Sequence, residues 1–80
     1  MKITLLFFGV AQDIAETRQL TFDLNYDATV LQLRQRLAER FAGMDESLAF
    51  AVAINEKLAD DNQVIREGDV VAVLPPVSGG

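Results

Sequence analysis

The sequence predicts an α+β fold in which a mixed sheet of about five strands carries one main helix across one face. Three features of the 80-residue sequence predict this fold. Residues 29–41 alone have the capped start and apolar stripe of a long helix. Residues 3–10 and 70–74 are apolar at both odd and even positions, as in strands that are covered on both faces. The other strand-like segments are short and separated by turn residues.

The chain begins with a predicted hairpin. Its first strand is residues 3–10, and Gly9 indicates a bulge or a close backbone approach. By alternation, one face carries Ile3, Leu5 and Phe7, and the other carries Leu6, Phe8 and Val10. Residues 11–18 form the connection, with a short helical turn at 12–16, and residues 18–25 alternate as a half-buried second strand. A hairpin connection makes the two strands antiparallel.

The main helix is predicted to begin after Thr29. The Thr29 hydroxyl can accept from the backbone of Gln32, and the Gln32 side chain can accept in return, which is a capping box. The stripe that would pack on the sheet consists of Val30, Leu33, Leu37 and Phe41, with Ala38 beside it. Gly43 is expected to end the helix in a left-handed conformation. The helix arginines are expected to form a solvated face.

Three shorter strands are predicted after the helix, at residues 50–54, 58–59 and 70–74. Turn residues separate them at 55–57 and 66–69. The first and last strands of the chain are the most apolar, which places them side by side at the centre of the sheet. Because both run in the same direction, the pair is parallel and needs a crossover, for which the helix is available. This order of elements is the β-grasp arrangement.

The composition argues against several function classes. The chain contains no Cys and no His, so it lacks thiolate chemistry and an imidazole for proton transfer near neutral pH. We therefore predict that the chain is not an enzyme on its own and binds no cofactor or metal. The carboxylates of Asp60 and Asp61 lack the spacing of an EF-hand calcium loop.

The net charge of −5 argues against nucleic acid and anionic membranes as partners. It favours a partner with a basic surface, although solubility alone explains an acidic balance equally well. No segment resembles a signal peptide, and no apolar run reaches the length of a membrane span. We expect a cytoplasmic protein.

A single helix covers one face of a sheet, so the sequence leaves a second apolar face without a cover. The residues expected on that second face are Leu6, Phe8, Ala72 and Leu74, with Leu58 beside them. An exposed patch of this composition marks a contact with another protein. The alternative is that loop 11–18 or loop 58–66 folds over it.

Two prolines end the last strand. Pro75 and Pro76 have no N–H to donate to a neighbouring strand, and they favour extended geometry. We therefore divide the chain into a folded domain, residues 1–76, and a C-terminal Gly-Gly tail, residues 77–80. The two final glycines would pass through a narrow channel, although the dipeptide alone also fits a frayed chain end.

Several segments resemble the small subunits of molybdopterin synthases, which are ubiquitin-like proteins of the β-grasp fold. The segments are Leu6-Phe7-Phe8, Ala53-Ile54-Asn55, Glu67-Gly68-Asp69-Val70-Val71 and Pro75-Pro76-Val77-Ser78-Gly79-Gly80. The resemblance covers nearly the whole chain, and the ending is its most specific element.

The resemblance implies a sulfur carrier in molybdenum cofactor biosynthesis. An E1-like adenylating enzyme would activate the Gly80 carboxylate with ATP, and a sulfur donor protein would then supply sulfur to give a thiocarboxylate. The tail residues Val77, Ser78 and Gly79 would insert into the large subunit, where sulfur passes to cyclic pyranopterin monophosphate. The family assembly is a heterotetramer of two small and two large subunits, with the catalytic pocket expected in the large subunit.

The composition agrees with this role. A carboxylate is a poor electrophile at neutral pH and needs activation, and a chain without Cys cannot carry a persulfide. The acyl carbon of Gly80 is then the plausible attachment point for sulfur. The resemblance also places Phe8, Leu58 and Leu74 at positions that contact the large subunit, and Leu6 lies on the same predicted face.

Two other functions stay open at this point. A thiamine-pathway sulfur carrier has the same fold and terminal chemistry, but its members are shorter between the first two strands and usually lack the diproline. A ubiquitin-like modifier or binding module is the second alternative. Ubiquitin-type tails carry arginines before Gly-Gly, whereas this tail carries Pro, Val and Ser. A modifier would form isopeptide bonds through Gly80.

Overall fold

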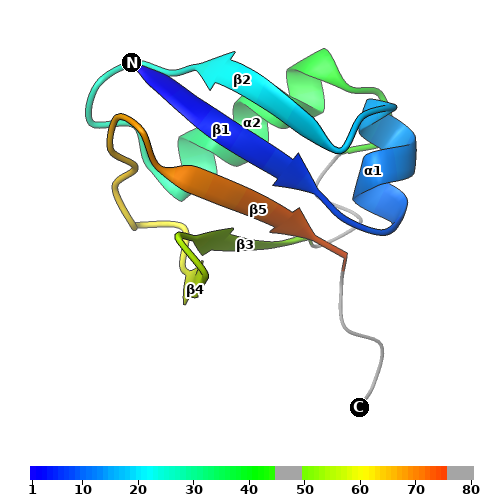
Figure 1. Ribbon diagram of the computed structural model, residues 1–80. Coiled ribbons are helices and arrows are strands. Elements are labelled where there is room, and N and C mark those ends of the chain that lie inside the picture. Colours follow the sequence, from blue (N-terminus) through cyan, green and yellow to red (C-terminus); the bar gives the residue numbers. More distant parts are fainter. Residues whose placement is uncertain (45–49, 76–80) are drawn as a thin grey trace.

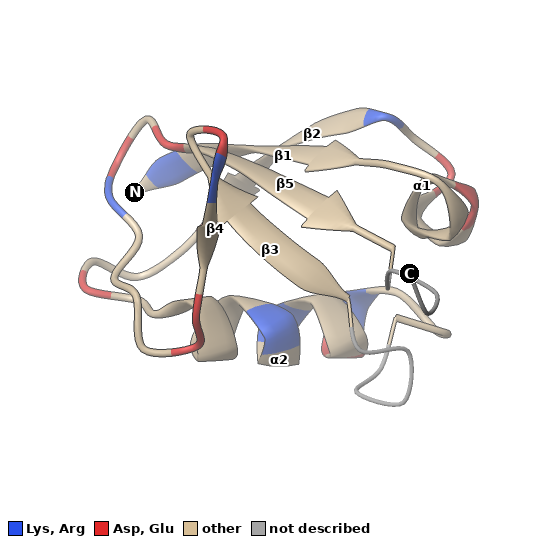
Figure 2. Cartoon of the chain, turned by 90° about the horizontal axis from the view of Figure 1, so that it is seen from below, with Lys and Arg blue, Asp and Glu red and all other residues tan. Residues whose placement is uncertain are grey.

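Five strands form one mixed sheet in a computed structural model that describes residues 1–44 and 50–75 (Figure 1). From one edge to the other they are β2 (Gln19–Asp23), β1 (Lys2–Phe7), β5 (Val70–Leu74), β3 (Ala51–Ile54) and β4 (Lys57–Ala59). The helices are α1 (Val10–Ala15) and α2 (Val30–Arg40). Helix α2 lies across one face of the sheet, and α1 lies at one end (Figure 2). The predicted β-grasp fold is confirmed.

Strands β1 and β5 lie side by side and parallel at the centre, as predicted. Phe7 pairs with Val73 in this ladder. The hairpin of β1 and β2 is antiparallel, with Leu5 opposite Leu20. Strand β3 pairs antiparallel with the other side of β5, and β4 turns back along β3 as the edge strand. Because β1 and β5 run in the same direction, their C-terminal ends meet at one end of the sheet.

The core lies between the sheet and α2. Its members are apolar side chains from the inner sheet face and the helix stripe, and those that are at most 2% exposed include Ile3, Leu5, Phe7, Val71, Val73, Val30 and Leu33. The parity predicted for β1 is therefore confirmed. Complete burial of such a side chain is worth about 1.5–3 kcal/mol. Among the residues that the structure describes, no polar or charged side chain is buried.

The first strand is shorter than predicted. It ends at Phe7, and Val10 already begins α1. Between them Gly9 turns the chain with φ 55° and ψ −132°. The apolar pattern continues past the turn because α1 buries Ala11 and Ala15 in the same core. The sequence pattern of the strand thus runs into that of the helix without a polar break.

The capping box at the start of α2 is confirmed. The Thr29 hydroxyl accepts from the Gln32 N–H at 3.3 Å, and the Gln32 side chain accepts from the Thr29 N–H at 2.9 Å. The next orphan N–H groups donate to a distant loop: Val30 to the carbonyl of Gln63 at 3.0 Å, and Leu31 to that of Asp61 at 3.1 Å. This loop therefore packs along the start of the helix.

The end of α2 differs from the prediction. The helix ends at Arg40, and the cap residue Phe41 is extended with φ −118°. Gly43 does have a positive φ of 94°, but it lies in the turn beyond the cap. Phe41 leaves the helical path and packs its ring edge-on against Phe7, with 5.8 Å between ring centroids.

Arg36 and Arg40 are exposed, as expected of a solvated helix face, whereas Arg34 is half-buried and bonded to the body of the protein. Arg34 donates from Nε to Asp61 Oδ1 at 2.8 Å and from Nη1 to the Phe50 carbonyl. Arg36 and Arg40 place their guanidinium carbons 5.3 and 5.7 Å from the centroid of the Phe22 ring. Together the three arginines tie α2 to the sheet and to the loop before β5.

Asn55 links the β3–β4 hairpin to β5. It has a φ of 49° and Glu56 has 73°, so both central residues of this two-residue turn are left-handed. The predicted turn at 55–57 is thus one residue shorter, with Lys57 already in β4. The Asn55 side chain accepts from the Val70 N–H at 3.0 Å and donates to Asp69 Oδ1 at 3.0 Å.

We predict that Asn55→Ala lowers the free energy of unfolding by about 1–3 kcal/mol. Alanine is strained at this positive φ and removes the acceptor of the Val70 N–H. Asn62→Ala is the matched control, because the bond at Asn62 comes from its backbone N–H. Urea unfolding of both variants measures the difference, and equal stabilities would contradict the account.

Candidate functional site

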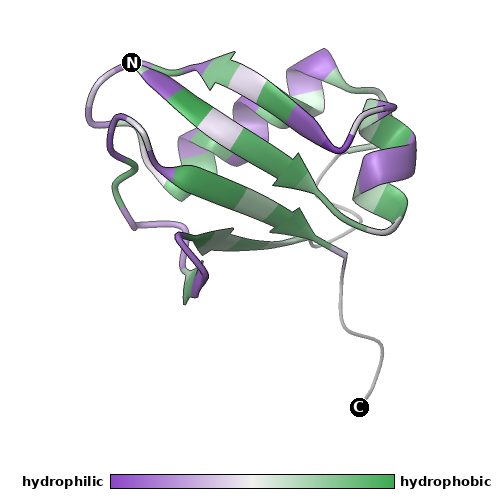
Figure 3. Ribbon diagram, in the orientation of Figure 1, coloured by the Kyte–Doolittle hydropathy of each residue, from purple (hydrophilic) through white to green (hydrophobic). Residues whose placement is uncertain are grey.

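The outer face of the sheet, which is the face opposite α2, is apolar over one half. A row crosses four strands there: Leu6 pairs with Ala72, Ala72 with Ala53, and Ala53 with Leu58. Leu74 lies one step further toward the end of β5, where it pairs with Ala51. Figure 3 shows that β5 and the second half of β1 are largely hydrophobic. In the other half of the face, Thr4 pairs with Thr21 of β2 and with the exposed Val70 of β5, so that this half is mixed in polarity.

Large apolar side chains are exposed on this surface. Leu58 is 76% exposed and Phe8 is 46% exposed, while Leu6 and Leu74 are half-buried. The two loops that were the alternative cover lie elsewhere. Ala11 and Ala15 of one loop and Ile65 of the other are buried in the core beneath the sheet. The predicted division of the sheet into a helix-covered face and an exposed apolar face is confirmed. Its use as a partner interface stays a prediction.

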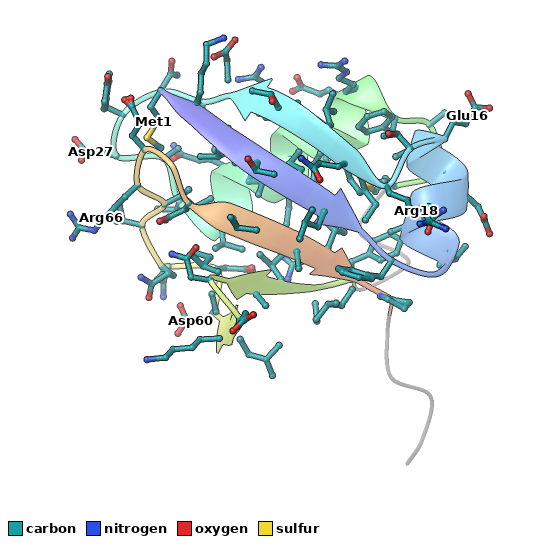
Figure 4. The ribbon with its side chains drawn as sticks, in the orientation of Figure 1. Met1, Glu16, Arg18, Asp27, Asp60 and Arg66 are labelled. Carbon is teal, nitrogen blue, oxygen red and sulfur yellow. The ribbon has the colours of Figure 1, made fainter. Side chains whose placement is uncertain are left out.

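Charged residues lie around the ends of the sheet. Figure 4 shows Asp27, Arg66 and Asp60 toward one end, and Glu16 and Arg18 toward the end where α1 lies. The outer face also carries a surface ion pair between Lys2 and Asp23, with 3.7 Å between Nζ and Oδ1, in its half of mixed polarity. Of these residues, Glu16 and Arg18 lie toward the end of the sheet that carries the apolar half.

The apolar half of the outer face lies at the end of the sheet where β5 finishes. Pro75 follows Leu74 directly and is half-buried. The predicted tail residues Val77, Ser78, Gly79 and Gly80, and the predicted domain boundary at 76, lie outside the described residues. What the structure brings together is therefore the exposed apolar surface and the point from which residues 76–80 begin.

The sequence prediction placed Val10 on the same strand face as Leu6 and Phe8 but did not anticipate its position in a helix. Val10 was assigned to the first strand, but it begins α1 and is 44% exposed. Only Gly9 separates it from Phe8 in the chain. Gly9 could have indicated that the strand ends there, because a glycine within an apolar run favours a turn as well as a bulge.

Within residues 1–44 and 50–75, no group of three or more Asp and Glu side chains is arranged to hold a metal ion. Among the described residues, no helix is long and apolar enough to cross a membrane.

Comparison with known proteins identifies the relatives of this chain. The family model described as the ThiS family matches residues 5–80. The molybdopterin synthase sulfur carrier subunit of Drosophila sechellia is 31% identical, and the match covers 100% of this chain and 92% of the relative.

Two solved structures have the same fold. One is the protein–protein complex of subunits 1 and 2 of the molybdopterin-converting factor from Helicobacter pylori, which contains a chain that is 33% identical with a TM-score of 0.69 and full coverage of both chains. The other is SAMP1 from Haloferax volcanii, with a TM-score of 0.83, 24% identity and full coverage of both chains. At that identity the second likeness concerns the fold alone.

Proposed function

Because this chain belongs to the ThiS family, we propose that it is the sulfur-carrier subunit of a molybdopterin synthase. The observation that carries the proposal is the position of the exposed apolar surface at the end of β5, directly before the segment that ends in Gly79-Gly80. A relative named as such a carrier subunit matches this chain over its whole length.

The chemistry is assigned to the carboxylate of Gly80. A carboxylate oxygen attacks the α-phosphorus of ATP on an E1-like adenylating enzyme, pyrophosphate leaves, and an acyl-adenylate forms. Hydrosulfide, or its equivalent from a sulfur donor protein, then attacks the acyl carbon, and AMP leaves. The product is a thiocarboxylate, whose sulfur is a far better nucleophile than a carboxylate oxygen.

The second half of the proposed cycle takes place with the large subunit. The thiocarboxylate sulfur attacks a carbon of cyclic pyranopterin monophosphate and forms a thioester as an oxygen substituent leaves that carbon. Water then attacks the thioester carbonyl, so that the acyl C–S bond breaks, the sulfur stays on the precursor and the Gly80 carboxylate is returned. Because a dithiolene contains two sulfur atoms and each chain carries one, two thiocarboxylated chains give up their sulfur for each molybdopterin. This stoichiometry agrees with a heterotetramer of two small and two large subunits.

The outer face is proposed to bind the large subunit. Its exposed members Phe8 and Leu58 and the half-buried Leu6 and Leu74 form a hydrophobic centre of the kind that interfaces bury. The complex from Helicobacter pylori, which contains subunits 1 and 2, supports a partner of this kind. The proton transfers and the precursor pocket are assigned to that partner, because this chain contains no His and no Cys.

The name of the matched relative favours molybdopterin over the thiamine pathway, and both sulfur carriers rank above a modifier. The cytoplasmic location remains a prediction. The test of the function is a single-turnover reaction of thiocarboxylated chain, large subunit and cyclic pyranopterin monophosphate. We expect one dithiolene for every two chains converted. A carrier that keeps its sulfur under these conditions would contradict the assignment.

We predict that Leu58→Asp weakens large-subunit binding by about tenfold or more, because it places a charge where an apolar side chain would be desolvated. Leu58 is 76% exposed, so its stability cost in the free chain is small. Leu31→Asp is the control, since Leu31 is also exposed but lies on α2. Titration calorimetry and thermal unfolding measure the two effects. If Leu58→Asp and Leu31→Asp bind the large subunit with equal affinity, the outer face is not part of the interface.

A further inference from the structure

Gly9 has a backbone conformation that other residues avoid. Its φ of 55° and ψ of −132° lie outside the regions that L-residues with a Cβ populate. The turn is fixed on both sides. Before it, the Phe8 N–H extends the central ladder by donating to the Val73 carbonyl at 3.2 Å. After it, the Gly9 carbonyl accepts from the Gln12 N–H at 3.0 Å and starts α1.

Gly9 also lies against Pro75. A Cβ added to Gly9 would stand 3.0 Å from Pro75 Cγ, 3.5 Å from its Cβ and 3.6 Å from its Cδ. The first distance is shorter than real Cβ atoms accept without movement of the neighbour. The missing side chain thus provides the space in which the proline ring packs against the turn between β1 and α1.

We propose that Gly9 is a positioning residue for the C-terminal tail, acting through the Pro75 ring. The ring fixes the φ of Pro75, and contact with Gly9 fixes where the ring lies. Pro75, which precedes the tail, is therefore held at a defined point against the turn that follows Phe8. This inference rests on the proposed function, because it concerns how the acyl carbon of Gly80 reaches the partner's pocket.

Delivery of a reacting carbon to a distant pocket depends on the starting point and direction of the arm that carries it, and a misplacement of about 1 Å can cost about 100-fold in rate. A side chain at residue 9 pushes the ring outward and strains the turn. Both effects move the base of the tail and leave Leu58 on the far edge of the sheet untouched.

The experiment compares Gly9→Ala with Gly68→Ala. Gly68 has a similar positive φ of 83°, but a Cβ there meets nothing within 4 Å. Both variants carry backbone strain, and only Gly9→Ala disturbs Pro75. Pro75→Ala and the double variant Gly9→Ala/Pro75→Ala complete a cycle, and Pro75→Ala also tests the contact if Gly9→Ala does not fold. Each chain is prepared as the thiocarboxylate and mixed with the large subunit and cyclic pyranopterin monophosphate.

We expect Gly9→Ala and Pro75→Ala each to lower the single-turnover rate of sulfur transfer by about tenfold or more, with large-subunit affinity within about threefold of wild type. The double variant should be no slower than the slower single variant, because both changes act through one contact. Gly68→Ala should lose stability and keep its rate. In the wild-type chain, nuclear Overhauser effects should join the Gly9 α-protons to the Pro75 ring.

Wild-type rates for both Gly9→Ala and Pro75→Ala would overturn the inference, as would additive losses in the double variant. An equal rate loss in Gly68→Ala would assign the effect to stability instead. These outcomes are separate from failure of the proposed function, in which the wild-type thiocarboxylate itself transfers no sulfur.

Discussion

We expect deletion of Gly80 to abolish sulfur transfer and to leave the fold intact. The proposed chemistry occurs at one acyl carbon, and the shortened chain presents the Gly79 carboxylate one residue short of the partner's pocket. An extended residue spans about 3.3–3.6 Å, which is more than a reacting pair can tolerate. We expect no change in stability, because glycine has no side chain to bury and residue 80 comes after the end of β5 at Leu74.

The measurement is single-turnover transfer from the shortened chain, together with its urea unfolding curve. Ser78→Ala is the control, since it changes a tail side chain and keeps the length. We expect loss of transfer by at least about 100-fold in the shortened chain and near wild-type transfer in the control. A shortened chain that unfolds would show that the tail is structural. One that transfers sulfur normally would show that Gly80 is not the reacting residue.

Phe7 and Phe8 are neighbours in the chain, but we expect Phe7→Ala mainly to lower stability and Phe8→Ala mainly to lower affinity for the large subunit. Phe7 is 1% exposed and packs against α2 and Phe41, so its truncation should cost about 3–5 kcal/mol of stability. This is a large share of the stability of a small domain. Phe8 is 46% exposed on the outer face, so its truncation should cost less than about 1 kcal/mol.

The affinity for the large subunit should show the reverse order. Phe8→Ala removes an aromatic side chain from the centre of the proposed interface and should weaken binding by about tenfold or more. Phe7→Ala should bind normally at temperatures where it remains folded. Chemical unfolding and titration calorimetry on both variants measure the four values. A larger stability loss in Phe8→Ala would mean that the two faces of β1 are reversed.

The sheet order and the parity of β1 were predictable because the strongest patterns in the chain are the apolar ones. Ile3, Leu5 and Phe7 alternate with residues of the other face, and a single amphipathic helix can cover only one of them. The parallel pairing of β1 and β5 followed from two apolar strands joined through one crossover. The Thr29–Gln32 capping box was predictable because both partners are local.

The points where the chain turns were less predictable. Val10 continues the apolar alternation of β1, so the pattern did not reveal that Gly9 ends the strand and α1 begins. Gly43 indicated the helix end, but α2 ends at Arg40, and Phe41 leaves the helical path and packs against Phe7. The half-buried Phe41 ring contacts a residue far away in the sequence, which the local pattern does not reveal.

The candidate site was predictable in its apolar part and less so in its geometry. Leu6 and Leu74 were assigned to the outer face from parity, and Leu58 was expected beside them. The pairing confirms that the three residues share one side. The contact of Gly9 with Pro75 was hidden, because it joins residues 66 positions apart in the sequence. Gly9 could be identified in the sequence as a close-approach residue, but its neighbour could be identified only in three dimensions.

The intact mass of the chain tests the central claim most directly. The chain is incubated with its adenylating enzyme, ATP and a sulfur source, and the mass is measured before and after. The account predicts replacement of one oxygen atom by one sulfur atom, located at Gly80 by fragmentation and lost again when the large subunit and precursor are added. An unchanged chain mass, or conjugates in which Gly80 is joined to lysines of other proteins, would contradict the sulfur-carrier assignment.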